Sequence, residues 1–134
     1  MPDELRNALD RCQELYAQGR YADALPHAAE ALRLGEEEFG PEHAETADLL
    51  NNLAGLYYNQ GLYTEAEPHY RRALAIVEKS LGPDHPEFGE ILDNLAGLYH
   101  AQGNYADAEP LYRRALTIFE NAFGPEHQLS LIHI

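Results

Sequence analysis

The chain has 134 residues, enough for one domain of ordinary size, and 45% of them are hydrophobic, which is too many for a disordered acidic segment. Nine Lys and Arg residues stand against 23 Asp and Glu residues, so the formal net charge is −14 at pH 7. This charge argues against nucleic acid and anionic membrane surfaces as partners, because both are bound through clustered basic residues.

The sequence repeats itself with a period of 42 residues. Residues 44–85 and 86–127 are identical at 24 of 42 positions, whereas residues 2–43 and 44–85 share only 13. The first copy is therefore the divergent one, as is typical of a terminal repeat with a neighbour on one side only. Each copy ends in the same loop, a Gly-Pro pair followed by an acidic residue and a histidine.

In the first copy, Asp10-Arg11-Cys12 stand where the later copies have Asn-Leu-Ala. The first helix of this copy is expected to pack differently and to act as an end cap. Cys12 replaces a buried alanine, and we interpret it as a small apolar residue and not as a nucleophile.

The second copy predicts a helix over residues 44–59, because Leu50, Leu53, Ala54 and Tyr57 follow the i, i+3, i+4, i+7 spacing of an amphipathic helix. Gly61 follows this helix and can adopt the left-handed conformation past its end.

A second helix is predicted from about Thr64 to Ser80, with Thr64 as N-cap and Pro68 in the first turn, where a missing N–H costs little. Its buried face is expected to comprise Ala66, Tyr70, Ala73, Leu74 and Val77.

The third copy repeats this pattern, with Pro86 at the first helical position. After His127 the period stops, and residues 128–134 form an atypical apolar tail. We interpret the tail as a non-native or truncated end, with a short natural tail as the alternative. The predicted fold is all-α, a solenoid of three stacked antiparallel helix pairs in one domain over residues 1–127.

The spacing from Asn52-Leu53-Ala54 through Tyr57, Gly61, Tyr63, Ala66 and Tyr70 to Ala73 resembles the tetratricopeptide repeat, in the 42-residue form found in kinesin light chains. The resemblance covers residues 3–127 and implies a right-handed superhelix whose first helices line a concave groove. It implies a protein-binding scaffold but no particular partner, since the repeat serves many partners. Motor cargo binding is not implied, because no coiled coil accompanies the repeats.

The groove implied by the resemblance supplies the candidate binding residues. Asn52 and Asn94 are the strongest, because an asparagine offers a donor and an acceptor to a peptide backbone and is otherwise disfavoured inside helices; the alternative is a bond to a neighbouring helix or to solvent. The other candidates are the outward-facing residues of the three first helices, Asp10, Tyr16, Asp48, Asn51, Gly55, Tyr58, Glu90, Asp93, Gly97 and His100.

Gly55 and Gly97 stand in mid-helix, where each costs about 1 kcal/mol relative to alanine. They either admit a ligand backbone or relieve crowding between helix pairs, and packing is slightly favoured. Tyr16, Tyr58 and His100 offer flat contact area, with partial packing as the alternative. The acidic groove predicts a basic or neutral peptide, and binding of a basic peptide should weaken as salt rises.

The three loop histidines, His43, His85 and His127, are about one repeat layer apart, which is too far for a shared zinc ion. We interpret them as capping and turn residues, and we expect no metal and no cofactor. Phosphate-loop, metalloprotease and nucleophile-elbow motifs do not occur in the sequence, so we expect no enzyme.

No apolar run approaches the roughly 20 residues of a membrane span, and the acidic start Met1–Glu4 lacks the features of a signal peptide. A single cysteine, with no partner for an intrachain disulfide, is typical of reducing compartments. We therefore expect a cytoplasmic protein. The leading functional hypothesis is a scaffold that binds an extended peptide or partner helix; the second is a piece of a longer array that self-associates through its terminal helices.

Overall fold

The computed structural model describes residues 2–124, and six helices account for most of them. No strand occurs within this described range. Contacts group the chain into two compact units, residues 1–76 and 77–134, with the boundary inside the fourth helix. The helices in chain order are α1 (Asp3–Ala17), α2 (Tyr21–Phe39), α3 (Ala44–Asn59), α4 (Tyr63–Ser80), α5 (Pro86–Ala101) and α6 (Tyr105–Phe123).

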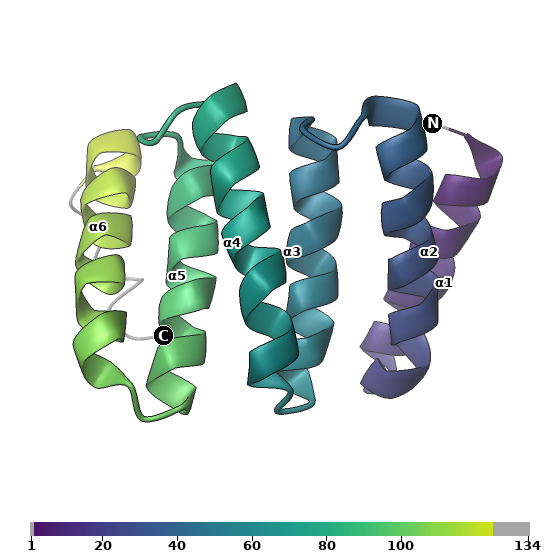
Figure 1. Ribbon diagram of the computed structural model, residues 1–134, viewed down its shortest axis with the longest axis horizontal. Helices are drawn as coiled ribbons and strands as arrows, with labels where there is room; N and C mark the ends of the chain where they lie inside the picture. Colours follow the sequence, from purple (N-terminus) through teal and green to yellow (C-terminus); the bar gives the residue numbers. More distant parts are fainter. Residues whose placement is uncertain (1, 125–134) are drawn as a thin grey trace. The chain divides into compact units, whose positions relative to one another are not determined.

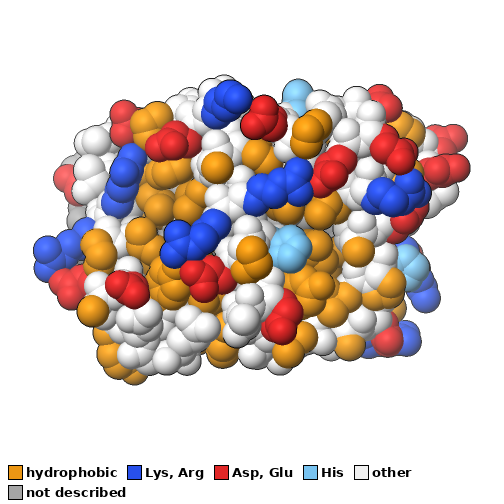
Figure 2. All heavy atoms as spheres, in the orientation of Figure 1, with side chains coloured by type: hydrophobic (Ala, Val, Ile, Leu, Met, Phe, Trp, Pro, Cys, Tyr) orange, Lys and Arg blue, Asp and Glu red, His pale blue; other side chains and the backbone are white. Residues whose placement is uncertain are grey.

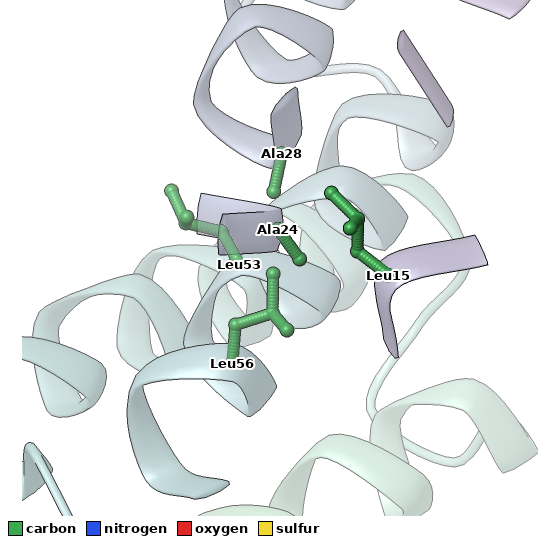
Figure 3. Close-up of a cluster of buried hydrophobic side chains, with 5 residues drawn as sticks. All are labelled: Leu15, Ala24, Ala28, Leu53 and Leu56. Carbon is green, nitrogen blue, oxygen red and sulfur yellow. The ribbon is translucent and has the colours of Figure 1, made fainter. Parts of the chain in front are cut away.

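In the first unit, α2 packs against both α1 and α3 (Figure 1). Leu15, Leu53 and Leu56 meet over the small side chains of Ala24 and Ala28, and all five side chains are buried (Figure 3). The alanines let the leucines of the two neighbouring helices lie close to the backbone of α2. Burial of each leucine contributes roughly 1.5–3 kcal/mol to folding.

The second unit is built on the contact between α5 and α6. Gly89 brings the two helices close, since a Cβ at this position would lie 3.1 Å from Ile118 and 3.3 Å from Phe119. Beside it, the Arg114 guanidinium lies 5.2 Å from the centre of the Phe88 ring, a cation–π arrangement.

The helix ends confirm the capping interpretation of the loop histidines. His43 Nδ1 accepts a hydrogen bond from the Glu45 N–H (3.0 Å), and His85 Nδ1 accepts one from the Glu87 N–H (3.1 Å). Each histidine thus satisfies a backbone donor that the first helical turn leaves without a partner. His127, like the tail at 128–134, lies outside the described residues. Gly61 adopts a φ of +76°, the left-handed conformation expected after α3.

Two local predictions for α4 are wrong. The helix begins one residue early, because the Leu62 carbonyl already accepts the Ala66 N–H (3.1 Å), so Thr64 lies inside the helix and is not its N-cap. Pro68 consequently stands inside the helix, beyond the first turn. Thr64 and Pro68 are both exposed, so the carbonyl that loses its helical partner to proline lies at the hydrated surface.

The predicted buried faces are confirmed. Leu50, Leu53 and Ala54 of α3 are buried, and Tyr57 is half-buried. On α4 the residues predicted to face inward are all buried except Leu74, which is half-buried: Ala66, Tyr70, Ala73 and Val77. The outward residues that remain on α1, α3 and α5 are the candidates for binding.

Candidate functional site

The candidate residues occupy three first helices, α1 and α3 in the first unit and α5 in the second. Six of them are exposed and the other six are half-buried. The exposed ones are Asp10, Tyr16, Asp48, Asn52, Glu90 and His100, and the half-buried ones are Asn51, Gly55, Tyr58, Asp93, Asn94 and Gly97. None is among the buried core residues, so the predicted outward direction of this set agrees with the structure.

Asn52 and Gly55 stand on α3, close to one turn apart. The Asn52 side chain is exposed and makes no hydrogen bond within residues 2–124. A Cβ added at Gly55 would meet a single neighbouring atom outside its own stretch of helix, the Tyr70 hydroxyl oxygen at 3.9 Å, which is ordinary van der Waals contact. Packing in this unit therefore does not require glycine at position 55.

Tyr70 lies beneath Gly55, a contact that the sequence does not predict. Its ring is buried on α4, and its hydroxyl approaches the surface helix at Gly55. Burial raises the pKa of Tyr70 well above its usual range, with smaller contributions from Tyr58 and Tyr16. The hydroxyl is therefore protonated and can donate a hydrogen bond at any physiological pH.

The outward aromatic residues are paired with the tyrosine that opens the second helix of the same repeat. Ring centres are 5.2 Å apart for Tyr16–Tyr21, 5.5 Å for Tyr58–Tyr63 and 4.8 Å for His100–Tyr105. Each contact closes the turn between two helices in a tilted or edge-to-face arrangement. The partial packing weighed in the sequence analysis is thus present. Tyr16 remains 49% exposed and accepts a hydrogen bond from Asn59 Nδ2 (3.3 Å).

The basic side chains are largely engaged in ion pairs with glutamate or aspartate. Figure 2 shows blue and red side chains next to one another on the face drawn. Such exposed pairs add little stability each, but they leave few free cations to offset the candidate acidic residues. The pairs are Arg11–Glu14, Arg20–Asp23, Arg33–Glu30, Arg33–Glu37, Arg71–Glu67, Arg72–Glu36 and Arg113–Glu109.

Two acidic features lie on the first helices. A shallow open hollow of about 360 Å³ on α1 is lined by Asp10, Gln13, Glu14 and Ala17. On α5 the half-buried Asp93 carboxyl has no hydrogen-bond or ion-pair partner within the described part of the chain. Burial raises the pKa of Asp93 because the charged form loses hydration. A positively charged group that approaches this carboxylate stabilises its charged form.

We expect Asp93→Asn to stabilise the folded protein at pH 7. The pKa of Asp93 is higher in the folded chain than the ordinary value of 3.8, so the folded state loses stability as pH rises through this range. Asparagine removes that penalty. Urea unfolding at pH 7 should show a higher midpoint for the variant, and the difference should disappear as the pH falls well below the ordinary value of 3.8, where the acid is protonated in both states. A lower midpoint at pH 7 would mean that the carboxylate has a favourable partner in the fold.

Within residues 2–124, no group of three His, Cys, Asp or Glu side chains is placed to hold a metal ion. Among the helices of the same range, none is both long enough and apolar enough to span a bilayer. Cys12 is half-buried and free, and burial raises the pKa of its thiol, which is the opposite of what a nucleophilic thiolate needs.

The family model for the tetratricopeptide repeat matches residues 7–61, 45–121 and 87–133. A search of the curated proteins found no match. Among solved structures, BtubC (BKLC) from P. vanneervenii is similar, with a TM-score of 0.77 and 25% identity over 82% of this chain and 43% of that chain. The chain thus spans less than half the length of BtubC.

Two further structures show the same fold. The TPR domain of Arabidopsis FLU has a TM-score of 0.77 and 21% identity over 88% of this chain and 96% of that domain. A Podosopora anserina protein described as a kinesin light chain with nearly identical TPR-like repeats has a TM-score of 0.80 and 22% identity, over 92% of this chain and 58% of that chain. These likenesses, with the six helices, confirm the predicted all-α helical solenoid class.

Proposed function

The chain belongs to the tetratricopeptide repeat family, and we propose that it binds an extended peptide or a helix of another protein through the outward residues of its first helices. Repeat domains of this family are protein–protein interaction scaffolds and are generally not enzymes. The observation that carries the proposal is the pair Asn52 and Gly55. Asn52 makes no hydrogen bond within residues 2–124, so its amide is available to a ligand, and packing in the first unit gives no reason for the glycine at position 55 beside it.

The proposed contact is between α3 and a ligand backbone. The Asn52 amide can donate to a peptide carbonyl and accept from a peptide N–H at once. A ligand chain can approach the bare backbone at Gly55 more closely than it could approach any side chain. Asn94 and Gly97 occupy the same positions of the next repeat, on α5.

The preferred ligand in this proposal carries positive charge. The net charge of −14 attracts basic peptides over distances of a Debye length, about 8 Å at physiological salt. At closer range the Asp93 carboxyl offers an unpaired anionic partner for a Lys or Arg side chain. Binding of such a peptide should therefore weaken as salt concentration rises, and salt-insensitive binding would contradict the steering by charge.

A random-peptide display selection against the full chain tests the proposal directly. We expect an enriched extended motif, and we expect Asn52→Ala to weaken its binding about tenfold, since two lost hydrogen bonds of roughly 1 kcal/mol each correspond to that factor or more. Asn121→Ala is the matched control, because Asn121 is exposed on α6 and makes no interaction within the described range. Equal loss in both variants, or no enrichment against a folded protein, would count against the proposal.

A further inference from the structure

The Tyr70 side chain combines a buried ring with a hydroxyl that reaches the surface. The residue is 3% exposed, and its hydroxyl makes no hydrogen bond within residues 2–124. No buried side-chain oxygen or nitrogen of the same residues lacks a hydrogen-bond partner, so the small exposed part of Tyr70 includes its hydroxyl oxygen. A donor that a packed ring holds in place, with no partner in the fold, is available to a ligand.

Two further tyrosines, Tyr16 of α1 and Tyr58 of α3, lie near this hydroxyl. Both contribute to the raised pKa of Tyr70, which requires that their hydroxyls are close to its own. A Cβ at Gly55 would lie 3.9 Å from the Tyr70 hydroxyl oxygen. Tyr16 is 49% exposed, and its hydroxyl accepts a hydrogen bond from Asn59 Nδ2 (3.3 Å). These five residues, Tyr16, Gly55, Tyr58, Asn59 and Tyr70, all belong to the first unit, and we call them the tyrosine surface.

The tyrosine surface offers hydrogen-bond donors beside aromatic rings. The Tyr16 oxygen accepts from Asn59, which leaves the Tyr16 O–H proton to donate outward. The Tyr70 hydroxyl stays protonated at physiological pH because burial raises its pKa, so it donates as well. Asn52 stands three residues before Gly55 on the same helix and adds the N–H groups of its amide. A ligand that fits this surface therefore presents carbonyl acceptors and apolar groups that can pack on rings.

A proline-rich segment has this chemistry. Each proline carries a carbonyl but no backbone N–H, so the segment brings acceptors to the surface without donors that would lose their water and find no partner. Its polyproline II conformation is populated before binding, which lowers the entropic cost of holding an extended chain. Its rings dock on surfaces lined by aromatic side chains. An ordinary extended peptide brings a backbone N–H at every residue and has no such preformed shape.

We propose that the tyrosine surface recognises proline, so that the partner is a proline-rich segment of another protein in the polyproline II conformation, with the Tyr70 hydroxyl donating to one of its carbonyls. This inference rests on the proposed function and narrows its ligand class, since Gly55 belongs to both surfaces. The positive charge inferred for the ligand belongs to residues that flank the prolines.

Fluorescence anisotropy with the full chain and two labelled peptides tests the proposal. The probe is an oligoproline of about nine residues, roughly 28 Å long at 3.1 Å per residue, which is comparable to the 16 residues of α3 at about 24 Å. The control peptide has the same length and alternates glycine with serine, so it is flexible and keeps its backbone N–H groups. Both peptides carry one C-terminal lysine and therefore the same charge. We expect saturable binding of the probe and at least tenfold weaker binding of the control.

Tyr70→Phe tests the hydroxyl alone, because the substitution keeps the ring. Probe binding should weaken about fivefold, the effect of one lost hydrogen bond of ordinary strength. The urea midpoint should not fall, since the hydroxyl has no partner in the described fold. Tyr57→Phe is the matched control in the same unit. The Tyr57 ring packs against the core cluster around Leu53 and lies 5.6 Å from His69, so its hydroxyl is not part of the tyrosine surface and probe binding should not change.

Three results would overturn the proposal: no probe binding to the folded chain, equal binding of probe and control, or probe binding that Tyr70→Phe does not weaken. Display selection separates this proposal from the peptide site itself. Enriched motifs without proline that lose affinity in Asn52→Ala would uphold the peptide site and overturn the preference for proline. Proline-rich motifs that lose affinity in both Asn52→Ala and Tyr70→Phe would support both.

Discussion

Replacing Leu56 with alanine is expected to lower the free energy of unfolding by about 3 kcal/mol, within the range of 2–5 kcal/mol found for buried leucines. Leu56 is buried in the cluster that joins α1, α2 and α3 (Figure 3). Its neighbours there include Ala24 and Ala28, whose methyl groups cannot extend into the space that alanine would leave. The loss therefore combines the transfer of the leucine side chain with a cavity that collapses poorly.

Urea unfolding followed by circular dichroism measures this change, with Leu62→Ala as the matched control. Leu62 lies in the loop before α4 and is 39% exposed, so the same truncation there should cost less than about 0.5 kcal/mol, as for other surface positions. A small loss at Leu56, equal to that at Leu62, would mean that the cluster in the first unit is not a cooperative core.

The helices of the second repeat could be predicted from the sequence because the spacing of the apolar residues and the positions of the helix-ending residues indicate the same boundaries. The apolar stripe of α3 and the glycine after it place the helix at 44–59, which is where it lies. The start of α4 was misplaced for a definite reason. Thr64 is a good capping residue by type. However, the Leu62 carbonyl, directly after Gly61, already accepts the first helical hydrogen bond, from the Ala66 N–H. Side-chain preference at one residue was thus outweighed by the backbone geometry of the preceding turn.

The direction of the candidate residues could also be predicted, but their neighbours could not. Helical spacing places Asn52 and Gly55 near each other on one face of α3. It does not reveal that the Tyr70 hydroxyl of α4 comes up beneath Gly55, because that contact depends on how two helices pack. The pairing of Tyr16, Tyr58 and His100 with tyrosines five residues later has a sequence signal, the shared 42-residue spacing of both partners.

The first helix of the first repeat differs from α3 at positions where α3 has buried leucines. On α1 the positions of Leu49, Leu53 and Leu56 are taken by Asn7, Arg11 and Glu14, and these three residues are exposed.

Gly55→Ala is expected to stabilise the folded protein while it weakens ligand binding. Alanine inside a helix is about 1 kcal/mol more favourable than glycine, and the new Cβ meets the Tyr70 hydroxyl oxygen at an ordinary distance of 3.9 Å. The free energy of unfolding should therefore rise by about that amount. Affinity for a display-selected peptide should fall about tenfold or more, because a methyl group would stand where the ligand backbone is proposed to lie.

Gly35→Ala is the matched contrast, since Gly35 is also a mid-helix glycine but is buried. A Cβ there would overlap the buried Leu49 side chain, so the strain of about 1–3 kcal/mol should exceed the gain in helix propensity and destabilise the fold. Peptide affinity of the folded variant should not change. The two glycines thus separate packing from binding: one is required by Leu49, and the other by no neighbour in its unit. If Gly55→Ala binds peptide as the unaltered chain does, close approach of a ligand backbone at Gly55 is ruled out.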